Sequence, residues 1–148
     1  MKKIFLVLFL SSFLFAFKVG DRLDSNTIDT LGLTDSNKIY VVDFFASWCK
    51  SCKIELPLIS NISKNNDKSK FEIIGVDMGE SLEDEKKFVS SLALEMKVIY
   101  DNNNEIVSKF NPIGVPALYY IKDGQVLKTL FGAVAHIDRV ILEDVKGL

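Results

Sequence analysis

Continuous apolar stretches alternate with amphipathic ones along most of the chain. Two runs, 39–45 and 71–76, are rich in β-branched and aromatic residues, which is typical of strands covered on both faces. Amphipathic stretches follow each of them, the first over about 50–64. The second begins near Ser81, which with Asp84 three residues later resembles a helix-capping pair. The pattern therefore predicts strands that alternate with helices.

Each predicted helix carries an apolar stripe that would face the sheet. In the 50–64 helix the stripe recurs every four residues, and Pro57 within it predicts a kink. The stripes consist of Ile54, Leu58 and Ile62 in this helix, Leu82, Phe88, Val89 and Leu92 in the next, and Ile137, Val140, Ile141 and Val145 in the last.

The remaining elements complete an α/β pattern. A short strand is expected at 97–100 and a short helix at 104–110. Two strands, 117–122 and 125–131, are joined by Asp123-Gly124, a strong hairpin signal. The order βαβαβαββα predicts an α/β fold with a central mixed sheet, parallel except for the antiparallel hairpin, flanked by helices.

The segment 18–38 differs in composition from the rest. Gly, Asp, Ser, Asn and Thr surround the spaced apolar residues Leu23, Ile28, Leu31 and Leu33. We expect an irregular lead-in, with at most a short strand, that covers one edge of the sheet.

The first residues have the order of a secretory signal. Lys2 and Lys3 precede an apolar run from Ile4 to Phe17. These fourteen residues would span about 21 Å as a helix, less than the roughly 30 Å hydrocarbon core of a membrane. We therefore expect a signal peptide at 1–16 and one domain at 17–148, with an uncleaved anchor as the alternative. The protein would be periplasmic or otherwise extracytoplasmic.

Size and charge limit the function classes. A chain of 148 residues, 48% hydrophobic and 26% charged, suits one folded domain. Without the two lysines of the signal, 16 basic residues face 20 acidic ones, a net charge of −4. This balance argues against nucleic acid as a partner, and we expect a monomer.

The only two cysteines, Cys49 and Cys52, stand where a strand gives way to a helix. Free N–H groups and the positive end of the helix dipole stabilise a thiolate there, and Lys50 adds a positive charge. Cys49, at the helix start, is expected to be the attacking thiolate. Cys52, one turn further in, would resolve the mixed disulfide.

Other roles for the two cysteines are a structural disulfide, a structural zinc site and a copper site with His136. A disulfide that closes so short a loop would stabilise the fold only weakly. Zinc would need further ligands, and the chain has one histidine and no third cysteine. Copper bound by the two cysteines and His136 would make the protein a metallochaperone. We expect no metal or other cofactor.

Residues 41–53, Val-Val-Asp-Phe-Phe-Ala-Ser-Trp-Cys-Lys-Ser-Cys-Lys, resemble the active-site strand and helix of the thioredoxin superfamily. Residues 114–117, Gly-Val-Pro-Ala, resemble its cis-proline loop. The apolar start, Gly20-Asp21, Glu55 and Pro57 are similar to the exported TlpA/ResA branch, whose members act as reductants in cytochrome c maturation or related thiol reduction. The resemblance implies a thioredoxin fold and a redox-active disulfide between Cys49 and Cys52.

The same resemblance implies roles for individual residues. Trp48 would pack over the disulfide, where simple core packing is the alternative. The Val115-Pro116 bond would be cis, and the Val115 backbone would pair with a bound substrate strand; an ordinary turn proline is the alternative. Asp43 would take the proton from Cys52, or else be a buried aspartate with a structural role only.

The resemblance to the TlpA/ResA branch also bears on the direction of electron flow and on the partners. Asp43 in place of the branch's usual Asn, Ala117 in place of Thr and the Lys50-Ser51 dipeptide leave the direction open. Only about twenty residues separate Asp77 from Lys97, too few for the helical insertion of DsbA-type oxidases, so a reductase is favoured over an oxidase or isomerase. Implied partners are client thiol proteins such as apocytochrome c and a membrane electron donor of the DsbD/CcdA type.

Overall fold

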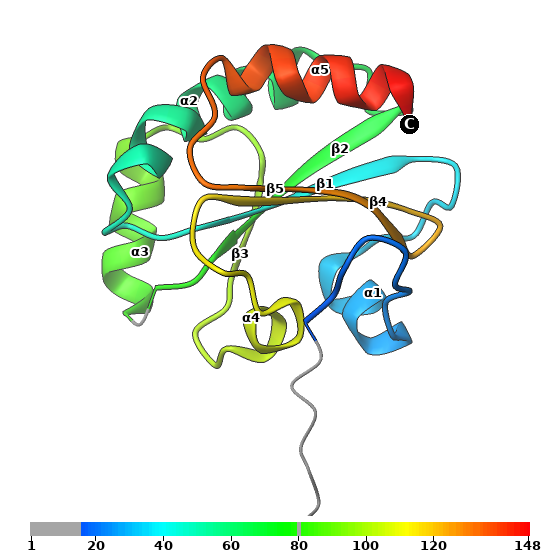
Figure 1. The fold of residues 1–148 in the computed structure, drawn as a ribbon. Coiled ribbons are helices and arrows are strands. Elements are labelled where there is room, and N and C mark those ends of the chain that lie inside the picture. The colour runs from blue at the N-terminus through cyan, green and yellow to red at the C-terminus, as the bar shows by residue number, and fades with distance from the viewer. Residues whose placement is uncertain (1–15, 80) are drawn as a thin grey trace, which may run out of the picture.

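Five strands form one mixed sheet at the centre of the structure, a computed structural model that describes residues 16–79 and 81–148 (Figure 1). Their spatial order is β3-β2-β1-β4-β5. β1 is parallel to β2, β2 is parallel to β3, and β4 is antiparallel to both β1 and β5. The predicted mixed sheet is therefore confirmed. The strands are β1 (Ile39–Phe45), β2 (Phe71–Asp77), β3 (Lys97–Tyr100), β4 (Ala117–Lys122) and β5 (Gln125–Phe131).

Helices cover both faces of this sheet (Figure 1). α2 and α5 lie side by side on one face, and α1 and α4 lie on the other. α3 packs beside α2, where Phe88 and Val89 contact the cluster around Phe45. The helices are α1 (Ser25–Leu31), α2 (Lys50–Asn65), α3 (Leu82–Ser91), α4 (Glu105–Phe110) and α5 (Ile137–Gly147).

Alternation along the strands divides the apolar core between the two faces. Val41 and Ile73 face α2 and α5, while Val42 and Ile74, their neighbours in sequence, face α1 and α4. All seven residues of β1 are buried, because the strand is central and both of its faces are covered. This strand is the rigid frame from which the loop carrying Cys49 starts.

The lead-in segment contains a helix, which the sequence pattern did not predict. Asp24 caps α1 by accepting a hydrogen bond from the Thr27 N–H, and Gly32, at φ 74°, ends it in the left-handed conformation. Leu31 and Leu33 are buried in the core on the α1 face. The segment therefore covers a face of the sheet through α1. Its first residues also pair with the edge strand β5, as expected: the Gly20 N–H donates to the Val126 carbonyl, the Val126 N–H donates to the Asp21 carbonyl, and Arg22 forms an isolated bridge with Gln125.

Two predicted helix stripes are wrong in part. In α2, Ile54 and Leu58 are 67% and 40% exposed, because the buried face holds Leu56 and Ile59 together with polar residues that a search for apolar spacing passes over. α2 continues through Pro57, and the kink expected there stays a prediction. In α3, Leu82 is exposed, and the buried residue of the first turns is Glu85. The Ser81 cap is confirmed, since its side chain accepts from the Asp84 N–H.

The expected signal peptide falls almost entirely outside the described residues. Among residues 16–79 and 81–148, no helix is both long and apolar enough to cross a membrane.

Candidate active site

The loop after β1 places Cys49 at the mouth of α2. Cys49 is the N-cap of this helix of 16 residues, and its Sγ accepts a hydrogen bond from the Cys52 N–H at 3.2 Å. The two cysteines form a disulfide whose Cα atoms are 5.3 Å apart. After reduction, the same N–H group and the helix dipole favour a thiolate on Cys49.

The two sulfurs differ in their access to solvent. Cys49 is 5% exposed and Cys52 is 1% exposed, so Cys49 is the more accessible of the pair, although both are mostly covered. Cys49 lines an open cavity of about 440 Å³. The residues around this cavity are Trp48, Cys49, Lys50, Ser51, Ile54 and Val115.

The cavity is bounded by exposed apolar side chains. Trp48 is 71% exposed, which rules out simple core packing for its indole ring and leaves it at the surface beside the disulfide. Ile54, from the first turns of α2, is likewise exposed. Apolar groups of this kind, next to a reactive sulfur, suit contact with another polypeptide.

The proline loop forms the other side of the cavity. The Val115-Pro116 peptide bond is cis. Val115 also lines an adjoining cavity of about 250 Å³ with Ile113 and Phe131, which are 86% and 42% exposed. The structure thus brings Trp48, Cys49, Lys50 and Val115 together, with Pro116 following at the base of β4.

Asp43 lies on the central strand β1, six residues before Cys49 in the sequence. It is 1% exposed, and its Oδ1 has no hydrogen-bond partner among the residues that the structure describes. Desolvation by burial, reinforced by the nearby charge of Glu55, holds the pKa of Asp43 well above its usual range. A carboxyl group with a raised pKa can accept and return a proton near neutral pH.

Glu55 is a second buried carboxyl group on this side of the sheet. Its Oε1 accepts the Val134 N–H at 2.7 Å, and burial raises its pKa, an effect that this hydrogen bond partly opposes. In the sequence, Glu55 is only a mark of resemblance to the TlpA/ResA branch. Its place on the buried face of α2, one residue before Leu56 and four before Ile59, is the signal that marks it as an interior group.

Two further acidic residues near the site were also missed. Glu85 on α3 and Asp77 at the end of β2 are 4% and 1% exposed. Glu85 accepts a hydrogen bond from Ser47, the residue before Trp48. The spacing of Glu85 from Phe88, Val89 and Leu92 places it on the inner face of the helix, and this pattern could have identified it.

No metal centre is evident at the disulfide. Among the described residues, no group of three or more His, Cys, Asp or Glu side chains is arranged to hold a metal ion. His136 is exposed at the start of α5 and belongs to no such group. The structure therefore gives no support to the copper alternative.

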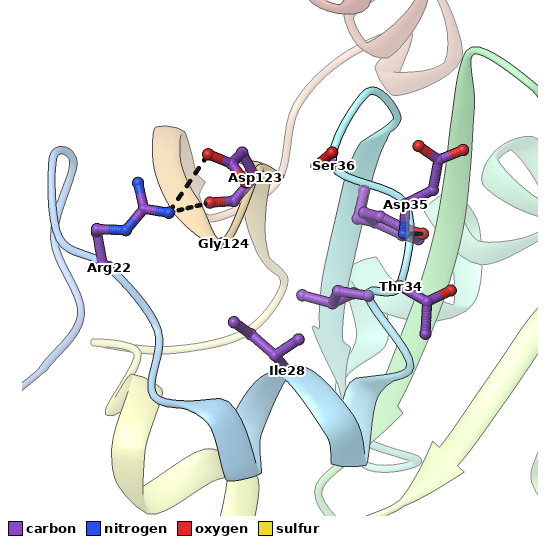
Figure 2. Close-up of a pocket in the computed structure, with 9 residues that line it drawn as sticks. Arg22, Ile28, Thr34, Asp35, Ser36, Asp123 and Gly124 are labelled. Carbon is purple, nitrogen blue, oxygen red and sulfur yellow. Dashed lines mark hydrogen bonds and ion pairs between the residues drawn. The ribbon is translucent and has the colours of Figure 1, made fainter.

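A separate cavity of about 230 Å³ lies at the opposite end of the sheet, near the start of β1 and the β4–β5 turn (Figure 2). Arg22 bridges its rim by donating hydrogen bonds to the carbonyl and the carboxylate of Asp123, at 2.6 and 3.4 Å. Ile28 and Tyr40 also line it. These residues are remote from the end of β1 that carries the cysteines.

Comparison with known proteins agrees with this geometry. Residues 37–125, more than half of the chain, match the family model described as thioredoxin-like. The thiol-disulfide oxidoreductase ResA of Bacillus thuringiensis subsp. konkukian is 30% identical over 92 residues, which cover 62% of this chain and 53% of that protein. Thioredoxin H4 of Arabidopsis thaliana is 30% identical over 99 residues, covering 67% of this chain and 64% of that protein.

A solved structure shows the same fold over nearly the whole described chain. The crystal structure of a putative thiol:disulfide interchange protein DsbE from Chlorobium tepidum superposes with a TM-score of 0.75. It is 18% identical and covers 89% of this chain and 98% of its own. The match thus supports the thioredoxin-like architecture. The chain spans about half the length of the ResA proteins that it matches.

Proposed function

Because this chain belongs to the thioredoxin-like family, we propose that it is a thiol-disulfide oxidoreductase that cycles between the Cys49–Cys52 disulfide and the dithiol. One observation carries the proposal. The disulfide lies at a helix N-terminus, and its outer sulfur lines an open cavity with Val115 of the proline loop. A disulfide of merely structural use would not need this access.

The exchange balances as two sulfur substitutions. The Cys49 thiolate attacks one sulfur of a client disulfide, and the other client sulfur leaves as a thiolate that takes a proton. The Cys52 thiolate then attacks Cys49 Sγ in the mixed disulfide and releases the second client thiol. Two electrons pass to the client, which is reduced, while the Cys49–Cys52 disulfide re-forms.

Asp43 is the proposed base for the second step. As a thiol, Cys52 must lose its proton before it can attack, and it is only 1% exposed, so water reaches it poorly. The raised pKa of the buried Asp43 carboxyl suits this transfer. Glu55 favours the protonated form of Asp43, because two carboxylates in one interior repel each other.

Client binding is assigned to the surface around Cys49. Trp48 would supply apolar contact, and the Val115 backbone would pair with an extended client segment next to the reacting sulfur. Lys50 would help to hold Cys49 ionised. Such backbone pairing demands little of the client's sequence, so we expect protein disulfides as the substrate class.

A reductase is the proposed direction. Ten residues of α3 take the place between β2 and β3 where a strong oxidase would need room for a helical insertion. The two lysines followed by an apolar run at the start of the sequence support a role outside the cytoplasm, with residues 1–16 as signal or anchor and 17–148 as the domain. Apocytochrome c would then be a candidate client, and a membrane thiol transporter of the DsbD/CcdA type a candidate donor.

Cysteine variants test the proposed cycle. Cys49→Ser should abolish the reduction of insulin disulfides, and Cys52→Ser should trap mixed disulfides that are visible on non-reducing gels. Ser90→Ala, at an exposed position near the end of α3, is the control. Full activity of Cys49→Ser would overturn the proposal.

The reduction potential decides the direction. Equilibration of the Cys49–Cys52 pair with glutathione should give a value near that of thioredoxin, about −270 mV. A value near that of DsbA, about −120 mV, would assign the protein as an oxidase instead.

A further inference from the structure

A pair of buried carboxyl groups lies beside the active site but takes no part in the exchange described above. Asp77 ends β2, and Glu85 belongs to the first turn of α3. They are 1% and 4% exposed, in a part of the structure where an apolar pair would be the ordinary choice.

Glu85 connects α3 to the loop that carries the reactive cysteine. Its Oε1 accepts a hydrogen bond from the Ser47 hydroxyl at 2.6 Å. Ser47 is followed directly by Trp48 and Cys49, which line the client cavity. Movement of the Glu85 carboxyl would therefore be transmitted to both of these residues.

Neither carboxyl group is satisfied if both are ionised. Asp77 Oδ1 accepts the Gly79 N–H at 2.9 Å, but Asp77 Oδ2 and Glu85 Oε2 are buried without a partner among the described residues. Ionised carboxylates only accept hydrogen bonds, so two of them cannot pair, whereas one proton between them provides the missing donor. Burial, followed by the hydrogen bond with Glu85, raises the pKa of Asp77 to about 7.

Gly79 leaves room for this arrangement. A Cβ atom at that position would overlap with Glu85 Cδ, so the glutamate occupies the space that any larger residue would need. The turn after β2 is thus fitted to the Glu85 side chain.

We propose that Glu85 is a positioning residue for the active site, and that one proton shared with Asp77 controls how firmly it holds the loop of Ser47, Trp48 and Cys49. With the proton in place, Glu85 bonds to Asp77 and to Ser47. When the proton leaves, the two anions repel each other and the bond to Ser47 weakens. The loop then becomes freer to move.

The surrounding charged groups do not replace this proton. From β3, Tyr100 faces the pair, and its own pKa is raised by burial and by the two carboxylates, so it stays neutral near pH 7. From α3, the Lys86 Nζ lies 6.0 Å from the centre of the Tyr100 ring, and Lys87 pairs with the exposed Glu83. From the loop, the facing group is the uncharged Ser47 hydroxyl.

The fluorescence emission of Trp48 reports directly on changes in the loop of Ser47, Trp48 and Cys49. Trp48 is the only tryptophan of the chain, and in the oxidised protein neither cysteine titrates, so the measurement requires no thiol exchange. The wild type should show a change in emission with a midpoint near pH 7. Asp77→Asn and Glu85→Gln should remove it, because their amides donate to the remaining carboxylate at every pH.

Control variants separate this pair from other acidic groups. Glu83→Gln, on the exposed side of α3, and Asp43→Asn, in the central strand β1, should keep the transition. Gly79→Ala should lose it because its methyl group displaces Glu85, whereas Gly147→Ala, with open space around it, should not. A wild type without a transition between pH 5.5 and 8.5, or a transition unchanged in Asp77→Asn, would refute the proposal.

The consequence for turnover rests on the proposed function and is measured separately. Ser47→Ala should lower kcat/KM for a client disulfide by about tenfold at pH 6, the effect of losing one hydrogen bond to a charged group. Near pH 8.5 the ratio of wild type to variant should approach one. An equal ratio of wild type to variant at both pH values would contradict the proposal that the proton shared by Asp77 and Glu85 controls the loop. Inactivity of every variant and of the wild type would instead reject the proposed function, while the fluorescence result would stand.

Discussion

Replacing Asp77 by Asn should make the protein more stable at alkaline pH relative to the wild type. The Asp77 pKa is raised from 3.8 to about 7 in the folded protein, so the folded state retains a proton that the unfolded chain has already lost. The stability of the wild type therefore falls as the pH rises from about 4 to about 7 and levels off above that range. Asn cannot ionise, and its amide can donate to Glu85 without a proton.

The magnitude follows from the width of this pH range. A pKa that differs by one pH unit between the folded and unfolded states changes the free energy of unfolding by about 1.4 kcal/mol. The full range would therefore give about 4 kcal/mol. Solvent and relaxation near the end of β2 weaken the interaction, and we expect about half of this value, about 2 kcal/mol. The free energy of unfolding of the wild type should thus fall by about 2 kcal/mol more than that of Asp77→Asn between pH 4.5 and pH 8.

Urea denaturation of the oxidised proteins, followed by far-UV circular dichroism, measures this difference without relying on Trp48. Equal m-values at each pH would show that only stability changes. In Glu83→Gln, an exposed carboxyl group of α3 is neutralised. The free energy of unfolding of this variant should change with pH as that of the wild type does. Parallel curves for wild type and Asp77→Asn would show that Asp77 titrates as an ordinary surface aspartate and would refute the reasoning.

Three further predictions concern other parts of the chain. Asp43→Asn should slow the decay of a mixed disulfide at pH 7 by about 10- to 100-fold, as seen by rapid quenching, because Cys52 loses its base. Phe110→Ala should lower the free energy of unfolding by about 3–5 kcal/mol in urea, since the fully buried ring lies about 5.0 Å from three other aromatic rings. Asp24→Ala should cost about 1 kcal/mol at pH 7 by uncapping α1. Hydrogen bonds from the Thr27 side chain and backbone lower the Asp24 pKa to about 2, so this difference should shrink as the pH falls from about 4 towards 2.

The sheet could be predicted from the sequence because its strands are distinctive. β1 is an almost unbroken apolar run, and the Asp123-Gly124 turn fixes the hairpin of β4 and β5. α1 was missed because seven residues give too short a stretch for periodicity to show, and its capping by Asp24 and Gly32 depends on individual backbone conformations.

The candidate site was predictable only where chemistry is tied to sequence neighbours. Cys49 and Cys52 stand three residues apart, and their position at a helix start follows from the end of β1. Contact between Glu85 and Ser47 joins residues 38 positions apart, and it depends on how α3 packs beside α2. Apolar spacing alone assigned the exposed Leu82 to the interior and passed over Glu85.

Four buried carboxyl groups near the active site depart from the apolar pattern of the core. Asp43, Glu55, Asp77 and Glu85 are each at least 95% buried, although a carboxyl group loses much of its hydration there. The raised pKa values of Asp43, Glu55 and Asp77 show that the interior favours their protonated forms. An exchange between thiol and thiolate requires groups that accept and return protons, and the apolar core around these carboxyl groups supplies the stability that offsets their burial.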